Sequence, residues 1–257
     1  MSGRIELERR ADGVATLWID NLDHRNALNN TLIDSLAENI RALGEDVSCR
    51  AVVLRGRGGI FCAGRELRDL RAICMADLGT ITAIYHRLRL LNEALLLCSR
   101  PTIAAIDTYA FGAGATLASW CDIAIAEEDA LMAYPEVQHG IVPSPAMMAL
   151  LRGVPRKAAM ELWLTGRRID AVEAARINLI TRAVPKGTLS AAVEETLAGI
   201  LRGSAEAIAR TKEFIVACED AGHRSAMLSA VDNISIGLTA PDTRRRIEAF
   251  LGRAKHG

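Results

Sequence analysis

Two turns built from small residues could present backbone N–H groups to a substrate. One is Phe61-Cys-Ala-Gly-Arg65, after a strand-like segment, and the other is Gly112-Ala-Gly114, at the start of a helix-like segment. Small side chains leave the amides uncovered, and the amino end of a helix adds partial positive charge. Two amides converging on one carbonyl oxygen would form an oxyanion hole that stabilises developing negative charge. Each turn alone is more typical of ordinary strand-to-helix packing.

A third segment, Tyr134-Pro-Glu136, supplies a carboxylate that could remove or deliver a proton. A glutamate in a turn after a proline is, by itself, also typical of an exposed surface position. Tyr134 and Trp120 are expected to belong to the core or to a pocket wall rather than to the chemistry.

The amino-terminal elements follow from hydrophobic periodicity and turn residues. A hairpin is predicted over Arg4–Arg9 and Val14–Asp20, around the Asp12-Gly13 turn. Apolar residues recur every three or four positions from 28 to 43, which predicts an amphipathic helix with a cap near Asn29.

The next elements alternate between strand and helix. Strands are predicted at 51–55, 102–107 and 122–126, with a helix over 81–98 that stops before Pro101. Between the last two of these strands, 112–120 reads as a tight turn that enters a helix.

The last third of the chain reads differently. Asp170 and Glu173 form a capping box, Gly166 is a plausible helix terminator, and Ser204 opens another helix. Only 179–184 reads as a strand. The sequence therefore predicts an α/β core followed by a C-terminal helical region.

Composition excludes several classes of protein. The 257 residues are 50% hydrophobic, which permits a large core and argues against intrinsic disorder. The 31 Lys plus Arg balance 31 Asp plus Glu, so no global field favours nucleic acid or an anionic membrane surface. No apolar run approaches the ~20 residues of a membrane span. The first residues lack the apolar core of a signal peptide, and we expect a cytoplasmic protein.

No resident cofactor is expected from the motifs. The six cysteines lack metal-ligand spacing and are expected to be reduced thiols. The chain also lacks a Gly-x-Gly-x-x-Gly dinucleotide fingerprint.

Four segments in this order resemble the enoyl-CoA hydratase/isomerase family, also called the crotonase family. They are His24-Arg-Asn-Ala-Leu-Asn29, Phe61-Cys-Ala-Gly-Arg-Glu-Leu67, the strand, turn, helix and strand over 101–125, and Thr165-Gly-Arg-Arg-Ile-Asp-Ala171. The resemblance implies a crotonase-like spiral of ββα units, with 1–190 as the core that holds the CoA and active sites. Residues 191–257 would then form a helical region for trimerisation and pocket cover, and trimers of this family often pair into hexamers.

The resemblance assigns roles at the active site. The backbone N–H groups of Arg65 and Ala113 would be the oxyanion donors, and Glu136 would be a catalytic carboxylate. Thr116 stands where hydratases of the family place a first catalytic glutamate. His139 stands where the family usually has an apolar residue, so we expect a hydrogen-bonded structural histidine there.

With one carboxylate of two present, isomerisation of 3-enoyl to 2-enoyl-CoA is favoured, because one acid group can remove a proton at C2 and return it at C4. Val142-Pro-Ser-Pro145 also replaces the family's usual glycine-rich Pro-Gly-Ala-Gly-Gly. Thr116 or Ser144 could still hydrogen-bond a water, which keeps a 2-enoyl-CoA hydratase with an altered first site as an alternative. A non-catalytic CoA-binding relative is the third possibility.

The resemblance also implies how the substrate is held. Coenzyme A would arrive as part of the acyl-CoA thioester rather than as a prosthetic group, and no metal, nucleic acid or membrane partner is implied. The CoA-binding residues would be Arg25, Ala27, Ala63, Phe250 and Arg253.

Overall fold

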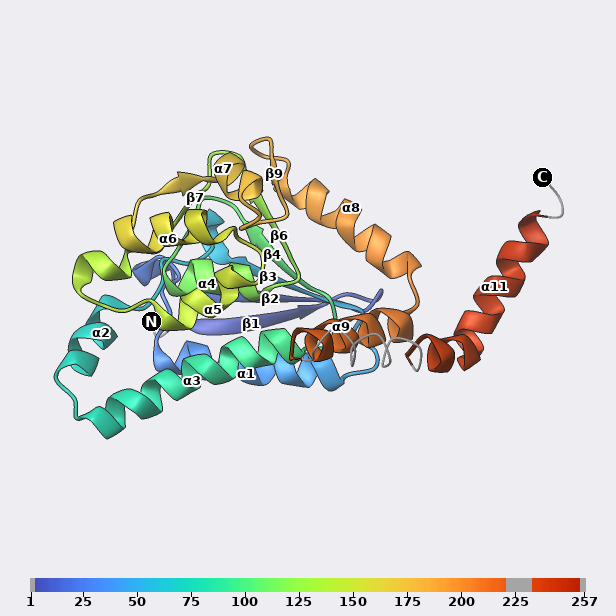
Figure 1. Cartoon of the computed structure of the whole chain (residues 1–257), viewed down its shortest axis with the longest axis horizontal. Helices are drawn as coiled ribbons and strands as arrows, with labels where there is room; N and C mark the ends of the chain where they lie inside the picture. Colours follow the sequence, from blue (N-terminus) through green and yellow to red (C-terminus); the bar gives the residue numbers. More distant parts are fainter. Residues whose placement is uncertain (1–2, 221–232, 255–257) are drawn as a thin grey trace.

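A computed structural model describes residues 3–220 and 233–254, apart from the side chains of Leu67, Pro145, Asp220, Glu248 and 250–254. Its centre is a six-stranded sheet in the order β1-β2-β3-β4-β6-β9 (Figure 1). The strands are β1 (Arg4–Arg9), β2 (Val14–Asp20), β3 (Ala51–Gly56), β4 (Thr102–Ile106), β6 (Ile123–Glu127) and β9 (Arg182–Val184). Only β1 runs antiparallel to its neighbour in this sheet, which confirms the predicted hairpin, and the other strands pair in parallel.

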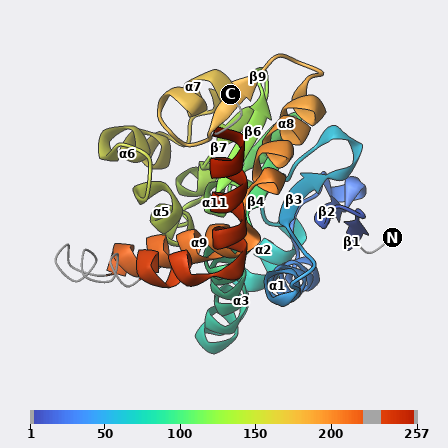
Figure 2. The same ribbon diagram turned by 90° about the vertical axis from the view of Figure 1, so that its right-hand side faces the viewer.

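Helices cover both faces of this sheet (Figures 1 and 2). The larger core lies beneath α1 (Asn30–Glu45), α3 (Leu78–Leu97) and α4 (Ala113–Trp120), and the smaller one beneath α8 (Leu189–Arg202). Alternate residues of a strand face opposite ways, so that Leu54 of β3 joins the larger core while its neighbour Val53 packs with the α8 side.

The predicted caps are present. The Asn29 side chain accepts from the N–H of Leu32, Asp170 accepts from Glu173, and Gly166 ends its helix in the left-handed conformation. The long helix α3 begins at Leu78 rather than at 81, because Asp77 accepts from the N–H of Thr80 and so caps an earlier start.

Sequence patterns did not reveal a second, three-stranded sheet in the order β5-β7-β8. Its strands are β5 (Tyr109–Phe111), β7 (Leu131–Ala133) and β8 (Ile169–Asp170), which are too short to show a period. A short helix α2 (Leu67–Cys74) was also not predicted. The remaining short helices are η1 (Leu22–His24), η2 (Arg57–Gly59), η3 (Pro135–His139), α5 (Ser144–Leu151), α6 (Arg156–Thr165) and α7 (Ala171–Arg176).

The C-terminal helical region is confirmed by α8, α9 (Ala205–Asp220) and α11 (Pro241–Ala254). The Lys212 ammonium anchors α9 to the core through Asp122 at 2.5 Å and the carbonyl of Arg100 at 2.8 Å. Figure 1 shows α11 extending away from the body of the molecule. Within the described ranges, no helix combines the length and hydropathy that crossing a membrane requires.

Candidate active site

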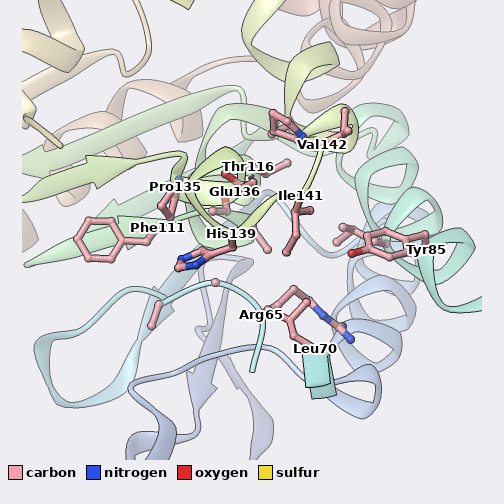
Figure 3. A pocket seen from close by; sticks show the side chains of 17 residues that line it. Arg65, Leu70, Tyr85, Phe111, Thr116, Pro135, Glu136, His139, Ile141 and Val142 are labelled. Carbon is pink, nitrogen blue, oxygen red and sulfur yellow. Dashed lines mark hydrogen bonds between the residues drawn. The ribbon is translucent and has the colours of Figure 1, made fainter. Parts of the chain in front are cut away.

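A cavity of about 220 Å³ opens between the two predicted turns and the segment that carries Glu136 (Figure 3). Arg65, Ala113, Thr116 and Glu136 all line it. Residues from three distant parts of the sequence therefore meet at one site, as the motif order predicts.

The first turn is held by a parallel bridge between Arg65 and Leu28. The Leu28 N–H donates to the Gly64 carbonyl at 2.7 Å, and the Glu66 N–H donates to the Leu28 carbonyl at 2.9 Å. Such a bridge uses the residues on either side of Arg65, so the Arg65 amide faces away from Leu28. No backbone carbonyl of the described residues accepts a hydrogen bond from it.

The second amide belongs to Ala113, the first residue of α4. It is one of the N–H groups that a helix cannot satisfy internally, and no backbone carbonyl in the described ranges accepts from it. Gly112 precedes it at φ 50° and ψ −115°, a left-handed conformation that favours glycine.

The two turns touch each other. Gly64 adopts φ 99°, and a Cβ added there would lie 2.8 Å from the Phe111 carbonyl oxygen and 3.6 Å from the Ala113 nitrogen. The Phe111 N–H donates to the Cys62 carbonyl at 3.0 Å. This contact brings the two turns together, and both Arg65 and Ala113 line the cavity.

Glu136 lies on η3, directly after β7, and the small sheet sets its position. The Gly112 N–H donates to the Ala133 carbonyl at 2.9 Å, which joins the second turn to the strand before Glu136. A Cβ added at Gly112 would lie 3.1 Å from Glu136 Oε1, a tight contact that would move the carboxylate from its present position.

The Glu136 carboxylate is poorly solvated and incompletely paired. Its Oε2 atom is buried and has no hydrogen-bond partner in the described part of the chain. Burial raises the pKa of Glu136 above its ordinary value, and the backbone N–H of Glu136 and the charge of His139 oppose this rise. A carboxylate with a raised pKa is a stronger base than an ordinary one.

Thr116 and Ser144 differ in their access to the cavity. Thr116 is buried in its wall, and its hydroxyl donates to the Gly112 carbonyl at 3.0 Å. Its proton is therefore engaged, and the oxygen can only accept a hydrogen bond from a water or substrate. Ser144 is exposed at the start of α5 and does not line the cavity.

The expectation for His139 is wrong. Its imidazole is exposed, lines the cavity, and makes no hydrogen bond within the described residues. Figure 3 shows it beside Glu136. Tyr134, by contrast, is fully buried with its hydroxyl 2.9 Å from the Ser119 hydroxyl, which confirms its predicted place in the core.

The predicted CoA-binding residues separate into two groups. Arg25 is exposed at φ 55°, and its carbonyl accepts from the N–H of Ala63 at 3.2 Å, so Arg25 lies next to a residue of the cavity wall. Ala27 is buried just behind. Phe250 and Arg253 belong to α11, and their side chains lie outside the described residues.

Sequence reasoning missed the structural role of Asn26. Its side chain is fully buried, accepts from the N–H of Asn21 at 2.9 Å, and donates to the carbonyls of Arg57 and Ile60. These bonds hold the loop that carries Arg25 against residues 57–60, which lead into the first turn. The signal in the sequence that could have indicated this role is a polar residue directly before the apolar pair Ala27-Leu28.

Within the described ranges, no group of three or more His, Cys, Asp or Glu side chains could hold a metal ion.

Comparison with known proteins agrees with this geometry. A family model described as Enoyl-CoA hydratase/isomerase matches residues 9–253. A putative enoyl-CoA hydratase of Thermus thermophilus is 32% identical over 93% of this chain and 94% of its own length. A mitochondrial enoyl-CoA hydratase domain-containing protein 3 of Mus musculus is 29% identical over 98% of this chain and 83% of its own. The crystal structure of an enoyl-CoA hydratase of Mycobacterium smegmatis superposes with a TM-score of 0.93 at 30% identity, covering 97% of this chain and 96% of that one.

Proposed function

The chain belongs to the enoyl-CoA hydratase/isomerase family and has the crotonase fold, and from this premise we propose that it isomerises 3-enoyl-CoA to 2-enoyl-CoA thioesters. One observation carries the proposal. Among the described residues that line the cavity, Glu136 is the only acidic side chain, and its Oε2 has no partner. The site thus offers one carboxylate, where hydration is better served by two acid groups.

The proposed reaction begins with the thioester oxygen between the amides of Arg65 and Ala113. The Glu136 carboxylate takes a proton from C2, and the C–H electron pair forms a C1–C2 double bond while the carbonyl oxygen becomes an enolate. The two amides stabilise that charge. As the carbonyl re-forms, the C1–C2 pair moves to C2–C3 and the C3–C4 pair takes the proton back from Glu136 at C4. Atoms and charge balance, and Glu136 is regenerated.

Hydration of 2-enoyl-CoA is the second candidate, and it is favoured by the names of relatives, such as the putative enoyl-CoA hydratase of Thermus thermophilus. A water would have to be oriented by Thr116, whose own proton already bonds to Gly112. A threonine in this state can accept a hydrogen bond from water but cannot deprotonate it. This difference makes isomerisation the better supported of the two.

The substrate's CoA part is proposed to bind along Arg25, Ala27 and Ala63, with Phe250 and Arg253 contributing from the last helix, and no prosthetic group takes part. Self-association into a trimer or hexamer and a cytoplasmic location are part of the same proposal. The name of the Mus musculus relative includes the word mitochondrial, so members of the family can differ in location.

The proposal is tested by assaying the purified protein with 3-hexenoyl-CoA and 2-hexenoyl-CoA. We expect double-bond migration to exceed hydration, and Glu136→Gln to lower the migration rate by about 10²–10⁴-fold. Glu128→Gln, which changes an exposed glutamate after β6, serves as the matched control and should retain the rate. Hydration that outpaces migration would favour the second candidate, and an unchanged rate in Glu136→Gln would remove the mechanism.

A further inference from the structure

The Arg65 side chain is a buried cation with few partners. Its side chain is 10% exposed, and its Nη2 donates to Asn30 Oδ1 at 2.9 Å. The nearest carboxylate, Asp69, lies 3.6 Å from Nη2, which is too long for a strong hydrogen bond. A guanidinium has five N–H donors, and no other hydrogen bond of this one is found in the described ranges.

The contacts with Asn30 and Asp69 do not fully compensate for the solvation that the guanidinium loses on burial. Loss of solvation is the largest influence on Arg65 and lowers its pKa, while Asp69 opposes that effect. A guanidinium that has lost water without gaining a full set of acceptors has hydrogen-bonding capacity left for a ligand.

Tyr85 places a second donor beside it. Tyr85 is half-buried on α3, lines the same cavity, and lies close enough to Arg65 to interact with its charge. Its hydroxyl makes no hydrogen bond within the described part of the chain. In Figure 3 the Arg65 guanidinium extends toward the side of the cavity that carries Tyr85, away from Glu136.

The wall around these two polar groups is apolar. Leu70, Leu88 and Ile141 line the cavity near them and suit the carbon chain of an acyl group. An acyl group ending in methyl would offer no acceptor to the Tyr85 hydroxyl or to the remaining N–H donors of the guanidinium once water is displaced, which costs binding free energy. An oxygen at the end of the chain would satisfy both.

We propose that the Arg65 guanidinium and the Tyr85 hydroxyl select acyl groups that carry an oxygen acceptor, a carboxylate above all, at the end remote from the thioester. The proposal rests on the proposed function only in that the site binds an acyl-CoA thioester. Because the Arg65 amide holds the thioester oxygen and its side chain meets the distal oxygen, this one residue sets the length of acyl group that can span the two contacts.

Equilibrium binding tests this selection without requiring turnover. Dissociation constants would be measured for saturated acyl-CoA thioesters of four, six and eight carbons, each ending in a carboxylate, a hydroxyl or a methyl group. At the best length we expect the carboxylate-ended ligand to bind about 10- to 100-fold more tightly than the methyl-ended one. The hydroxyl-ended ligand should fall between them.

Variants separate selection from a structural role. Arg65→Met should abolish the ratio of the two dissociation constants, and Tyr85→Phe should reduce it several-fold, while Arg89→Met on the exposed face of α3 should preserve it. A ratio near one at all three lengths in the unmodified protein would overturn the proposal, as would an Arg65→Met variant that weakens every ligand equally. A clear ratio in a protein that isomerises nothing would instead count against the proposed function and leave the selection standing.

Discussion

Glu136 shows how local solvation prepares a carboxylate for proton transfer. Its Oε2 is buried without a partner among the residues that the structure describes, Gly112 leaves space beside its Oε1, and the nearby His139 limits the rise in its pKa. A fully paired carboxylate would be held ionised and would be a weak base, whereas this one can gain a proton without breaking an ion pair.

The raised pKa of Glu136 predicts that the reaction rate increases and the stability decreases as the pH rises. Its folded-state pKa lies above the ordinary value of 4.5, so the base form accumulates only at higher pH, and kcat/KM should rise with an apparent pKa above 4.5. Between the unfolded and folded pKa values the folded protein binds more protons, so the free energy of unfolding falls as pH rises through that window.

Glu136→Gln removes the free-energy cost of burying an ionised carboxylate, and it also removes the proposed catalytic base. We expect the variant to be at least as stable as the unmodified protein at about pH 8, with the difference disappearing below about pH 4, where both unfolded and folded carboxyls are protonated. Chemical denaturation across that pH range measures it. If the variant is less stable than the unmodified protein at pH 8 but not at pH 4, Glu136 is stabilised by a partner instead.

The sequence predicted some of these residues and not others. The meeting of Glu136, Arg65 and Ala113 at one site was expected from the resemblance of four segments to the family, because each turn alone is typical of ordinary packing. The exposure of His139 and the position of Tyr85 near the Arg65 side chain were not expected, because they depend on where η3 and α3 lie relative to the first turn. No local pattern encodes the distance between segments twenty residues apart.

Short elements do the positioning in this fold. The small sheet of β5, β7 and β8 carries Gly112 and Glu136 to one place, yet its strands are too short for periodicity to reveal. The long elements, such as α1 and the parallel strands, were predictable because each repeats its apolar pattern over several turns or is bounded by clear turn residues. Prediction therefore succeeded for the scaffold and failed for the connections that align the site.

Gly64 tests the contact between the two turns. Gly64→Ala places a Cβ 2.8 Å from the Phe111 carbonyl at a φ of 99°, and we expect about 1–3 kcal/mol loss of stability together with a rate loss of about 10²–10³-fold from displaced amides. Gly187→Ala is the control, because it has a φ of 79° but no atom within 4 Å of the added Cβ. The free energy of unfolding would be measured by denaturant titration and the rate by the isomerisation assay, for both variants and the unmodified protein. A Gly64→Ala enzyme with normal activity would contradict the account of the oxyanion hole.

At the scale of the whole molecule, the C-terminal part offers surface that a single chain does not cover. Ile234, Ile236, Leu238 and Ile247 are exposed, and α11 stands away from the core, tied to the end of α8 by Arg246. Exposed apolar residues gathered on a projecting segment are typical of an interface between protein chains.

Self-association follows as a prediction for the full chain. Sedimentation velocity at micromolar concentration should give the mass of a trimer or hexamer, and Ile247→Glu should shift the distribution toward smaller species. Val47→Glu, which alters an exposed apolar residue after α1, should leave the distribution unchanged. A full chain that sediments as a monomer would contradict the proposed assembly.

The most direct test of the central claim follows the proton itself. A single turnover of 3-hexenoyl-CoA carrying deuterium at C2, run in water enriched in oxygen-18, would be analysed by mass spectrometry. One carboxylate that removes and returns the proton predicts 2-hexenoyl-CoA with part of the deuterium moved to C4 and no oxygen-18 in the product. A product that contains oxygen-18, or one in which no deuterium has moved, would contradict it.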